Sequence, residues 1–573
     1  MSTEKTLRRP CKDEIDLTTM VVGDFGKWQL QISILMALLK LPAAWYQLNI
    51  IFMNPPQDFW CVKPTAIKCS FEEWNRISSP YIDGFPCLIF DPEVLISSPT
   101  LDRAFIPLVE CQQFIFDNST WIRTMTSEWN QVCNGHWLIH LTQCVMMWGI
   151  FVGSLVFGFF ADKVGRKHTL MTAIIMQSAL SFLVTISPNY YMFIVTWFVL
   201  SLASGGIGII SFVMCVEVVS GKWRTIIPVL YQLPFGIGNA LMAGLAYWLR
   251  DWRLLELTLS MLSSLYISYC FFITESPRWL LATGRTEEAL EVLKKVAKKN
   301  GRPFDLEKVK HLIPEPGPKV PGPNFIEFMK KKNMRLKTIL LSVNWFCLGL
   351  AFYTFSQYLG TIGENIFLTV ALTGIISTPG GLLCVFIITK VGRKTTIWIF
   401  QLATAFCFVF IQLIPKDKYK NDWPRLGFAG LGFAGMAGTI PSLYLYSGEL
   451  YPTLGRNAGV GGVTVFARIG SMIAPLIVDL DEWVADLPLT FLAITSFAQM
   501  ILIFPLPETK DYPLPETLEE AEIFTKRRRK SCMSLMASKE TLWENSYTWR
   551  DIGRRNRHNK PVEVLYESVY FKK

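Results

Sequence analysis

The sequence predicts an all-α integral membrane protein with twelve transmembrane helices in two six-helix halves. Three observations predict this class: the composition, the spacing of the apolar runs, and a repeat between the halves. Of 573 residues, 51% are hydrophobic and 18% are charged, and the mean hydropathy is +0.31, which is too apolar for one soluble core. The net charge of +10 would suggest nucleic acid in a soluble chain. Here it fits basic loops on the cytoplasmic side of a membrane.

Twelve apolar runs are each close to the roughly 20 residues that a helix needs to cross a bilayer. They lie near residues 30–53, 137–161, 169–188, 191–217, 226–249, 254–274, 337–360, 366–389, 395–415, 426–448, 457–479 and 487–506. Several runs are short or carry a charge, so eleven or thirteen helices stay open as alternatives. Residues 1–27 are polar and of mixed charge, which is not typical of a cleavable signal peptide.

Loop charges predict the orientation of the chain. The segment between the two sets of six runs is strongly basic, whereas the loop 53–136 carries ten Asp or Glu against five Lys or Arg. The positive-inside rule then places the basic segment and both termini in the cytoplasm and the acidic loop outside the cell. The expected location is the plasma membrane, with lipid as a partner and no nucleic acid.

The predicted units follow from these boundaries. They are a cytoplasmic N-terminus (1–27), a six-helix half (28–274) with a large extracellular loop (53–136), a cytoplasmic linker (275–336), a second half (337–507) and a cytoplasmic tail (508–573). The linker contains IPEPGPKVPGP, which is typical of an extended segment. The tail contains KRRRKSCMSLMASKE, which we interpret as solvated; contact with lipid headgroups is the alternative.

The large loop has the composition of an extracellular segment. Five of the thirteen cysteines lie in it: Cys61, Cys69, Cys87, Cys111 and Cys133. This density predicts disulfides in an oxidising compartment, with the pairing open and one cysteine left over. Asn118 begins the sequon Asn-Ser-Thr, which predicts a glycosylation site. The cysteine spacings match no zinc pattern, and we expect no metal site.

The two halves share matching charged motifs. Gly165-Arg166-Lys167 ends the second apolar run, and Gly392-Arg393-Lys394 ends the eighth. Further charges repeat at a spacing of seven residues, as Glu217 and Arg224 after the fourth run and as Glu449 and Arg456 after the tenth. Helices 2 and 8 therefore match, as do helices 4 and 10. Two such halves related by an axis along the membrane normal are typical of a transporter.

The motifs resemble those of a known family. GFFADKVGRK is similar to the loop signature of the major facilitator superfamily. The chain also resembles the organic ion transporter family, which groups organic cation, organic anion and carnitine-type carriers. This resemblance covers about residues 15–525. The motifs that carry it are TESPRWLLATGRTEEALEVLKKVAKKNG, GELYPTLGRNAGVGG, ARIGSMIAPLIV, LPETK and the Cys-rich loop ending STWIRTMTSEWNQVC. The resemblance implies the major facilitator fold and transport of a small organic ion by alternating access, without a cofactor.

Charges at the cytoplasmic helix ends are expected to form a gate that pairs when the halves close on the inner side. The resemblance implies this role for Asp162, Arg166, Glu217, Arg224, Arg393, Glu449 and Arg456. Such pairs are worth about 1 kcal/mol each where solvated, which substrate binding can reverse. The second copy has Thr389 in place of Asp162, so the half-gates are unequal. Gly158 and Gly165 are expected to let helices approach closely.

Arg468 is the sharpest candidate for binding the substrate. It lies about a dozen residues into the eleventh helix, in a run of small and apolar residues. A basic residue inside a membrane indicates a functional site by default, and a guanidinium can hold a carboxylate through two hydrogen bonds. An internal structural pair is the alternative. The resemblance implies Arg here in anion and zwitterion carriers, Lys at Gly381 in anion carriers, and an acid at Ser377 in cation carriers.

Aromatic and polar residues are expected to line the same cavity. The resemblance implies this for Tyr231, Gln232, Trp345, Phe352, Tyr353 and Gln47. Aromatic faces hold ammonium groups by cation–π attraction worth about 0.5–2 kcal/mol; helix packing is the alternative for any one of them. Lys40 in the first helix is unusual, and facing the cavity, snorkelling and pairing with an acid are all open. With one fixed positive charge, the cavity suits a zwitterion or a small monoanion.

The sequence therefore predicts a carrier of small organic ions, with a carboxylate-bearing zwitterion or anion, carnitine- or β-alanine-like, as the substrate. An organic cation carrier and a non-transporting sensor on the same fold are the alternatives. An enzyme is disfavoured because the sequence has no GxxxxGK[ST], HExxH or GxSxG motif in a fitting context. No buried carboxylate stands out as a proton carrier, so the coupling ion stays open.

Overall fold

The computed structural model describes residues 21–55, 57–63, 70, 73–74, 78, 87–92, 94, 106–221, 223–312, 325–363, 365–416, 418–452, 455–510, 515 and 518–523. Most of the predicted N-terminus, the Pro-rich stretch 313–324, most of the tail and Cys69 lie outside these residues. Within the described part of the chain, eleven helices are long and apolar enough to cross a membrane, and one shorter apolar helix covers Leu487–Ile503. The prediction of twelve helices is confirmed.

The first half contains six spanning units. Its helices are α2 (Lys27–Leu38), α3 (Lys40–Leu48), α4 (Ile50–Met53), α8 (Trp137–Val164), α9 (Arg166–Thr185), α10 (Tyr190–Glu217), α11 (Trp223–Leu230), α12 (Leu233–Leu249), α13 (Trp252–Ser264) and α14 (Tyr269–Phe272). The first unit is α2 to α4, the fifth is α11 with α12, and the sixth is α13 with α14. Asn189 and Asp251 cap α10 and α13 by accepting hydrogen bonds from backbone N–H groups of the first turn.

The second half repeats the arrangement, and each of its six spans is one continuous helix. They are α19 (Lys332–Ile362), α20 (Ile366–Lys390), α21 (Arg393–Leu413), α22 (Trp423–Leu450), α23 (Arg456–Val478) and α24 (Leu487–Ile503). Asn365 caps α20 through two backbone N–H groups, and proline at the start of α22 and α24 suits the first turn, where the missing N–H has no partner to lose.

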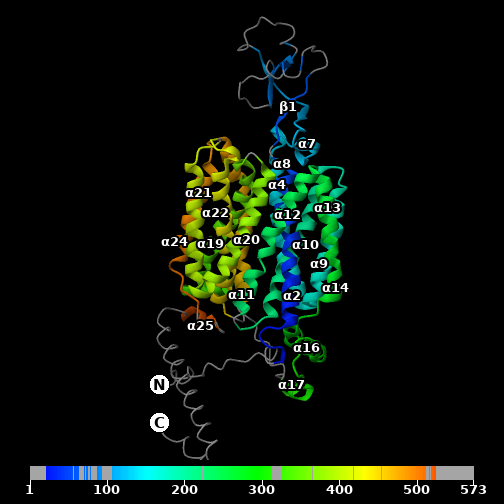
Figure 1. Ribbon diagram of the computed structural model, residues 1–573, viewed down its shortest axis with the longest axis vertical. Coiled ribbons are helices and arrows are strands. Elements are labelled where there is room, and N and C mark those ends of the chain that lie inside the picture. Colours follow the sequence, from blue (N-terminus) through cyan, green and yellow to red (C-terminus); the bar gives the residue numbers. More distant parts are fainter. Residues whose placement is uncertain are drawn as a thin grey trace, which may run out of the picture.

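Two faces of the bundle carry different extra structure. We name them the loop face, which carries residues 57–136, and the linker face, which carries α15 (Pro277–Ala282), α16 (Thr286–Lys299), α17 (Leu306–Leu312), α18 (Phe325–Lys330) and α25 (Leu518–Ile523). Figure 1 shows the first half, blue to green, beside the second half, yellow-green to orange, with α12 and α20 in contact where the halves meet.

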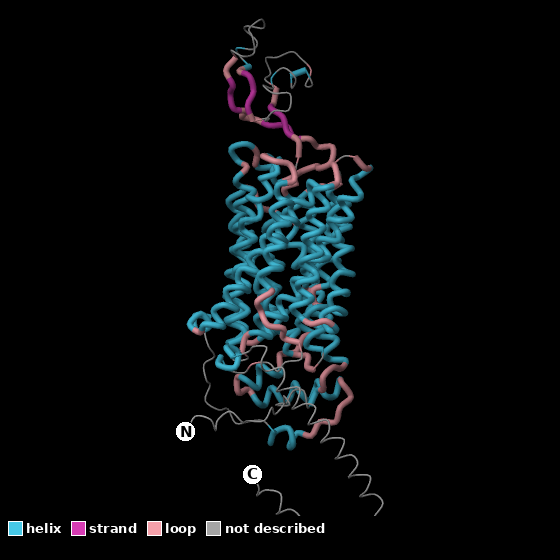
Figure 2. The backbone as a smooth tube through the Cα atoms, turned by 90° about the vertical axis from the view of Figure 1, so that its left-hand side faces the viewer, coloured by secondary structure: helices cyan, strands magenta, loops and turns pink. Residues whose placement is uncertain are grey.

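The large loop projects beyond the bundle as two short antiparallel sheets (Figure 2). In one, β1 (Phe59–Cys61) pairs with β4 (Phe114–Phe116); in the other, β2 (Leu88–Phe90) pairs with β3 (Leu108–Glu110). Disulfides join Cys61 to Cys111 and Cys87 to Cys133, which resolves the pairing that the sequence left open. Asn118 is exposed in the turn after β4, and its glycosylation stays a prediction.

The end of this loop is anchored to the first half. α7 (Met125–Trp129) places Glu128 beside α13, where the carboxylate accepts hydrogen bonds from Arg253 at 2.7 Å and from the Trp252 indole at 2.9 Å. Partial burial opposes the charge of Glu128, but the bonds from Arg253 and Trp252 outweigh it, so the pKa of this carboxyl is lowered. Arg123 adds an ion pair with Asp251 at 3.0 Å. The loop is thus tied to the α12–α13 turn by charge.

Candidate functional site

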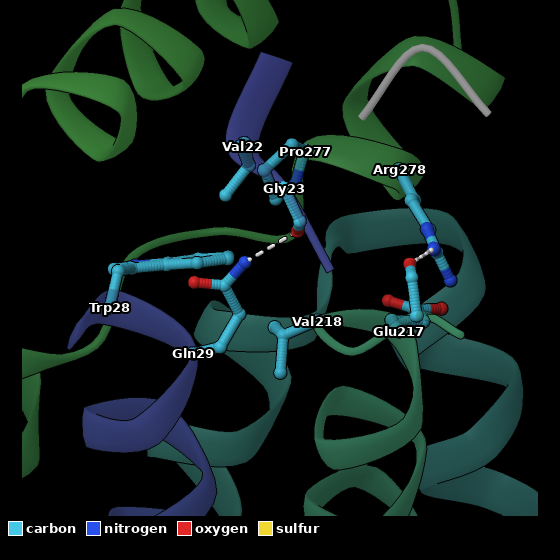
Figure 3. A pocket seen from close by; sticks show the side chains of 9 residues that line it. Val22, Gly23, Trp28, Gln29, Glu217, Val218, Pro277 and Arg278 are labelled. Atoms are coloured by element: carbon cyan, nitrogen blue, oxygen red, sulfur yellow. Dashed lines mark hydrogen bonds between the residues drawn. The ribbon is translucent and has the colours of Figure 1, made fainter. Parts of the chain in front are cut away.

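A cluster of charges at the linker face of the first half surrounds Arg166. Its guanidinium donates to Asp162 at 2.6 Å and to Glu217 at 3.2 Å, and so links the ends of α8, α9 and α10. A third bond goes to the backbone carbonyl of Ala161 at 2.7 Å. Glu217 also lies beside Arg278 on the wall of a small pocket, where Arg278 donates to Ser220 at 2.8 Å (Figure 3). The structure brings three of the predicted gate residues together.

The matching cluster of the second half surrounds Arg393. Its Nε and Nη2 atoms donate to Glu449 at 3.0 and 2.9 Å, which joins α21 to the end of α22. Thr509 donates a further hydrogen bond to Glu449 at 2.6 Å. Thr389, which replaces the acid of the first copy, donates to the carbonyl of Val385 in its own helix. The predicted inequality of the two clusters is therefore visible in the geometry.

Each cluster also contains a carboxylate that the sequence reading missed. Glu275 accepts hydrogen bonds from the backbone N–H groups of Arg166 at 2.9 Å and Lys167 at 3.1 Å, and so caps α9. Glu508 does the same for Arg393 at 2.9 Å and for Lys394 at 3.1 Å, and caps α21. A negative charge at a helix N-terminus is stabilising. The signal was present, because TESPR and PETKD place these acids at the same point after helices 6 and 12.

The glycine of each motif makes room for the capping acid. Gly165 has φ +122° and Gly392 has φ +118°, which L side chains rarely adopt. A Cβ atom would lie 2.6 Å from the Glu275 carboxylate at the first site and 2.8 Å from the Glu508 carboxylate at the second. The expectation for Gly158 was wrong, because the space beside it is open.

The two halves touch at the linker face around these clusters. Arg393 donates to Thr225 at the start of α11, in the opposite half, at 3.2 Å. Arg456 lies near both Glu449 and Arg224, so its charge interacts with the other half as well as with its own. Deeper in the bundle, the rings of Phe212 and Tyr444, on α10 and α22, lie 5.5 Å apart.

Arg468 lies in the middle of the bundle between the halves. Its guanidinium donates to the hydroxyl of Tyr353 on α19 at 3.3 Å. That hydroxyl donates in turn to Gln47 on α3, in the first half, at 2.9 Å. These three residues form one hydrogen-bonded chain across the interface, and no described carboxylate forms an ion pair with Arg468. The guanidinium thus keeps donors for a ligand.

Lys40 supplies a second basic group at this place. Its ammonium lies 4.7 Å from the ring centroid of Tyr231, at the break between α11 and α12, and close enough to Arg468 for the two charges to repel. No described acid forms an ion pair with Lys40 either. The place of Lys40 beside Tyr231 favours the first of the three alternatives left open, in which this side chain faces the centre. Gln232 follows Tyr231 at the same break and is half-buried.

Aromatic rings from both halves surround these groups. Trp345 packs edge-on against Tyr444 at 4.5 Å and donates to Ser447 at 3.1 Å, so its indole is committed to packing inside the second half. Phe352 lies between Tyr353 at 5.2 Å and Phe235 of the first half at 6.1 Å. Tyr444 was missed by the sequence reading, because a tyrosine in SLYLYSG marks no inward face by itself.

The halves also meet at the loop face. Phe52 and Phe367 stack at 5.8 Å across the interface, and Trp121 from the loop packs on Phe367 at 4.8 Å. His140 of α8 pairs with Asp479 at the end of α23 at 2.7 Å. The centre with Arg468 and Lys40 is therefore flanked by contacts between the halves on both sides.

Known proteins are similar to this chain in sequence and in fold. The family model described as "Sugar (and other) transporter" matches residues 112–521. "Solute carrier family 22 member 13" of Homo sapiens is 30% identical over 560 residues, with 96% of this chain and 98% of that protein covered. The chain belongs to the organic ion transporter family of the major facilitator superfamily.

Other members and more distant structures agree. "Organic cation transporter protein" of Drosophila melanogaster is 27% identical over 521 residues, with 88% of this chain and 94% of that protein covered. A solved structure of the xylose transporter XylE from E. coli, in an inward-open conformation, has a TM-score of 0.56 at 14% identity, covering 86% of this chain and 98% of that one. The organic ion transporter family consists of multi-pass membrane transporters and not of enzymes, as the sequence predicted.

Proposed function

We propose that this protein carries small organic ions that bear a carboxylate, either anions or zwitterions, across the plasma membrane by alternating access. The observation that carries the proposal is the guanidinium of Arg468 at the interface of the halves, beside a second basic group, Lys40, and without an ion-paired acid among the described residues. Charges in such a setting need a partner, and a carboxylate from the substrate supplies one.

The chemistry of the side chains at the site suggests which of them would bind which part of the substrate. The planar guanidinium of Arg468 suits a carboxylate held by two hydrogen bonds, and the compact ammonium of Lys40 adds a second contact. Tyr231, Tyr353 and Tyr444 offer aromatic faces to any ammonium group of the same substrate. A purely cationic substrate would meet the like charge of Arg468 here and a second basic group in Lys40, so the organic cation alternative is disfavoured.

The packing of the fifth helix against the eighth suggests why the second basic group comes from elsewhere. The resemblance implies a lysine at Gly381 in anion carriers, but a Cβ atom at Gly381 would lie 2.5 Å from the Leu233 side chain of the opposite half. A side chain at this position would require the Leu233 side chain of α12 to move aside. Lys40 on α3 is the basic group that this chain has in its place.

Alternating access with the linker face in the cytoplasm is the mechanism that we infer. Contacts between the halves lie on both sides of the centre, with Arg393 and Thr225 at the linker face and Phe52 and Phe367 at the loop face. Breaking one set while keeping the other would open the centre to one side at a time. Glu256 is a buried carboxyl, 1% exposed, that accepts a hydrogen bond from Asn49 at 2.9 Å, and it is a candidate for coupling in a sequence where no buried carboxylate stood out as a proton carrier.

The test is uptake of three labelled probes: β-alanine as a zwitterion, a small monocarboxylate, and tetraethylammonium as a cation. Parent, Arg468→Ala and Lys40→Met chains are compared at equal surface amounts. A hydrogen bond to a charged group is worth about 1.5–3 kcal/mol, so we expect uptake of carboxylates to fall roughly 10- to 100-fold in Arg468→Ala.

Lys163→Gln serves as the matched control, because its ammonium lies outside the centre, 4.4 Å from the Phe159 ring. Equal loss for all three probes in Arg468→Ala would show that the residue is structural and would remove the substrate class. Binding of a carboxylate probe to the purified protein without uptake into liposomes would favour the sensor.

A further inference from the structure

A cluster of metal-binding side chains lies at the loop face, away from the site already described. His136 is the residue that precedes α8, and His140 follows one turn later on the same face of that helix, as residues four apart do. Their rings lie 5.1 Å apart at 86°. Asp479 ends α23 in the other half, and its carboxylate lies 2.7 Å from His140 Nε2.

These three residues converge on one point. One potential ligand atom from each lies within 4.8 Å of the other two, and it is the one such group of three or more that the described part of the chain contains. All three side chains are half-buried, so an ion from solution can reach them. An ion pair between His140 and Asp479 would not require His136 nearby. The presence of this second histidine therefore favours a metal site over a simple ion pair.

The structure assigns this cluster as a reversible binding site for a divalent transition-metal ion of the Zn²⁺ class. Two imidazole nitrogens and one carboxylate oxygen are a ligand set that Zn²⁺ accepts, with water in the fourth position. Ligand atoms around tetrahedral zinc lie about 3.3 Å apart, so a cluster within 4.8 Å needs side-chain shifts of only about 1–2 Å.

The surroundings favour exchange over permanent retention of the metal. A histidine ligand usually donates its second ring N–H to a supporting acceptor, but His140 Nδ1 is buried without a hydrogen-bond partner in the described residues. Without that support the site is expected to bind zinc more weakly than a structural zinc centre does. Free zinc in the surrounding medium would then set its occupancy.

The position gives the bound ion a consequence for transport. His136 and His140 belong to the first half and Asp479 to the second, so separation of the halves at the loop face takes the site apart. An ion that binds only the assembled site stabilises the conformation closed at that face, and opening for substrate weakens the ion's binding by the same factor. This consequence, unlike binding itself, rests on the proposed alternating-access function.

Binding is tested on the full-length purified chain in detergent, without added histidine tags, titrated with ZnCl₂ and, as a control ion, with MgCl₂. We expect one saturable zinc site and a melting midpoint that rises with zinc. Loss of a group that merely supports a zinc ligand costs roughly 10- to 100-fold in affinity. His136→Ala and Asp479→Asn should therefore weaken binding at least about tenfold.

Two further variants keep the test decisive. His168→Ala is the matched control, because His168 is 69% exposed at the opposite face and its removal should leave zinc binding unchanged. Asp479→His makes a three-histidine set, which zinc favours, and should keep or tighten binding even if Asp479→Asn proves unstable. Absence of saturable zinc binding by the parent, or equal binding by the parent and His136→Ala, would overturn the assignment.

The functional consequence has its own readout. External ZnCl₂ should lower the maximal uptake rate of whichever carboxylate probe the parent carries, without competing with it, and a chelator should restore the rate. His136→Ala should be resistant at the same concentrations. If zinc binds the cluster but leaves uptake unchanged, the metal site stands, and its link to the movement of the halves is contradicted.

Discussion

The clusters around Arg166 and Arg393 are two copies of one motif, and they differ in the partners that the arginine bonds. Both arginines follow a glycine with positive φ and begin a helix, and both pair with a glutamate at the end of the next long helix. Both helices are capped by a glutamate from a later segment. The first cluster has a second acid, Asp162, bonded at 2.6 Å. The second has Thr389 at that position, and its arginine reaches Thr225 of the opposite half instead.

This difference in bonding indicates two roles for the motif. One is to hold the helices of one half together, and the other is to contact the opposite half. Among the described residues, the guanidinium of Arg166 donates only to groups of its own half, so this cluster holds α8, α9 and α10 together whatever the other half does. Arg393 lacks the neighbouring acid, and its Nη2 atom divides its bonds between Glu449 and Thr225. The second cluster is therefore the one whose bonding must change when the linker face opens.

The largest effect is expected from removing each arginine. Arg166→Leu and Arg393→Leu should each destabilise the purified protein by about 3–5 kcal/mol, because a largely buried glutamate loses its partner. Arg393→Leu should in addition open the linker face. The measurements are thermal unfolding and the alkylation rate of Cys384, which is fully buried beside Val229 of the other half.

Lys163→Gln is again the matched control and should change neither quantity. Faster alkylation of Cys384 in Arg166→Leu than in Arg393→Leu would reverse the assignment of the two roles.

A medium effect, equal in both clusters, is expected from the glycines. Gly165→Ala and Gly392→Ala each force a side chain into an unfavourable backbone region and against a capping carboxylate, at a cost of about 1–3 kcal/mol. Thermal unfolding measures it, with Gly158→Ala as the control because its surroundings are open. A cost at one glycine alone would mean that the two caps are not equivalent.

The smallest effect is expected from Asp162→Asn. The Asp162 side chain is 63% exposed, so its pair with Arg166 is worth under about 1 kcal/mol. We expect slower uptake of a carboxylate probe with ligand binding still measurable, since a difference of this size shifts a balance between conformations without unfolding the protein. Thr389→Asp is the converse change and should draw Arg393 away from Thr225. Unchanged uptake kinetics in both variants would remove Asp162 from the gate.

Sequence reasoning located most of the residues in these clusters but only part of their partners. The repeat of Gly-Arg-Lys and of the glutamates indicated which charges correspond, and the structure pairs Arg166 with Glu217 and Arg393 with Glu449. Glu275 and Glu508 were missed because each lies more than a hundred residues from the helix that it caps. Thr225 was missed because a threonine at a helix start has many ordinary explanations.

The centre shows the same limit. Arg468 was conspicuous because an arginine inside an apolar run needs a reason, but Lys40 could equally have faced lipid or water. The helices of the bundle are apolar on every side, so their sequences mark no inward face in the way that an amphipathic helix does. The rotation of α3 about its axis, which turns Lys40 toward Tyr231, is set by packing against neighbours.

The sequence by itself determined the class of protein, the number of spanning helices, the repeat and the family, because hydrophobicity and motif spacing are properties of contiguous residues. Only the tertiary structure decided which groups meet: Lys40 with Tyr231, Arg393 with Thr225, and His136 and His140 with Asp479. These contacts depend on how helices from different halves are rotated about their axes and packed against one another. That packing minimises the free energy of the whole bundle and not of any one segment.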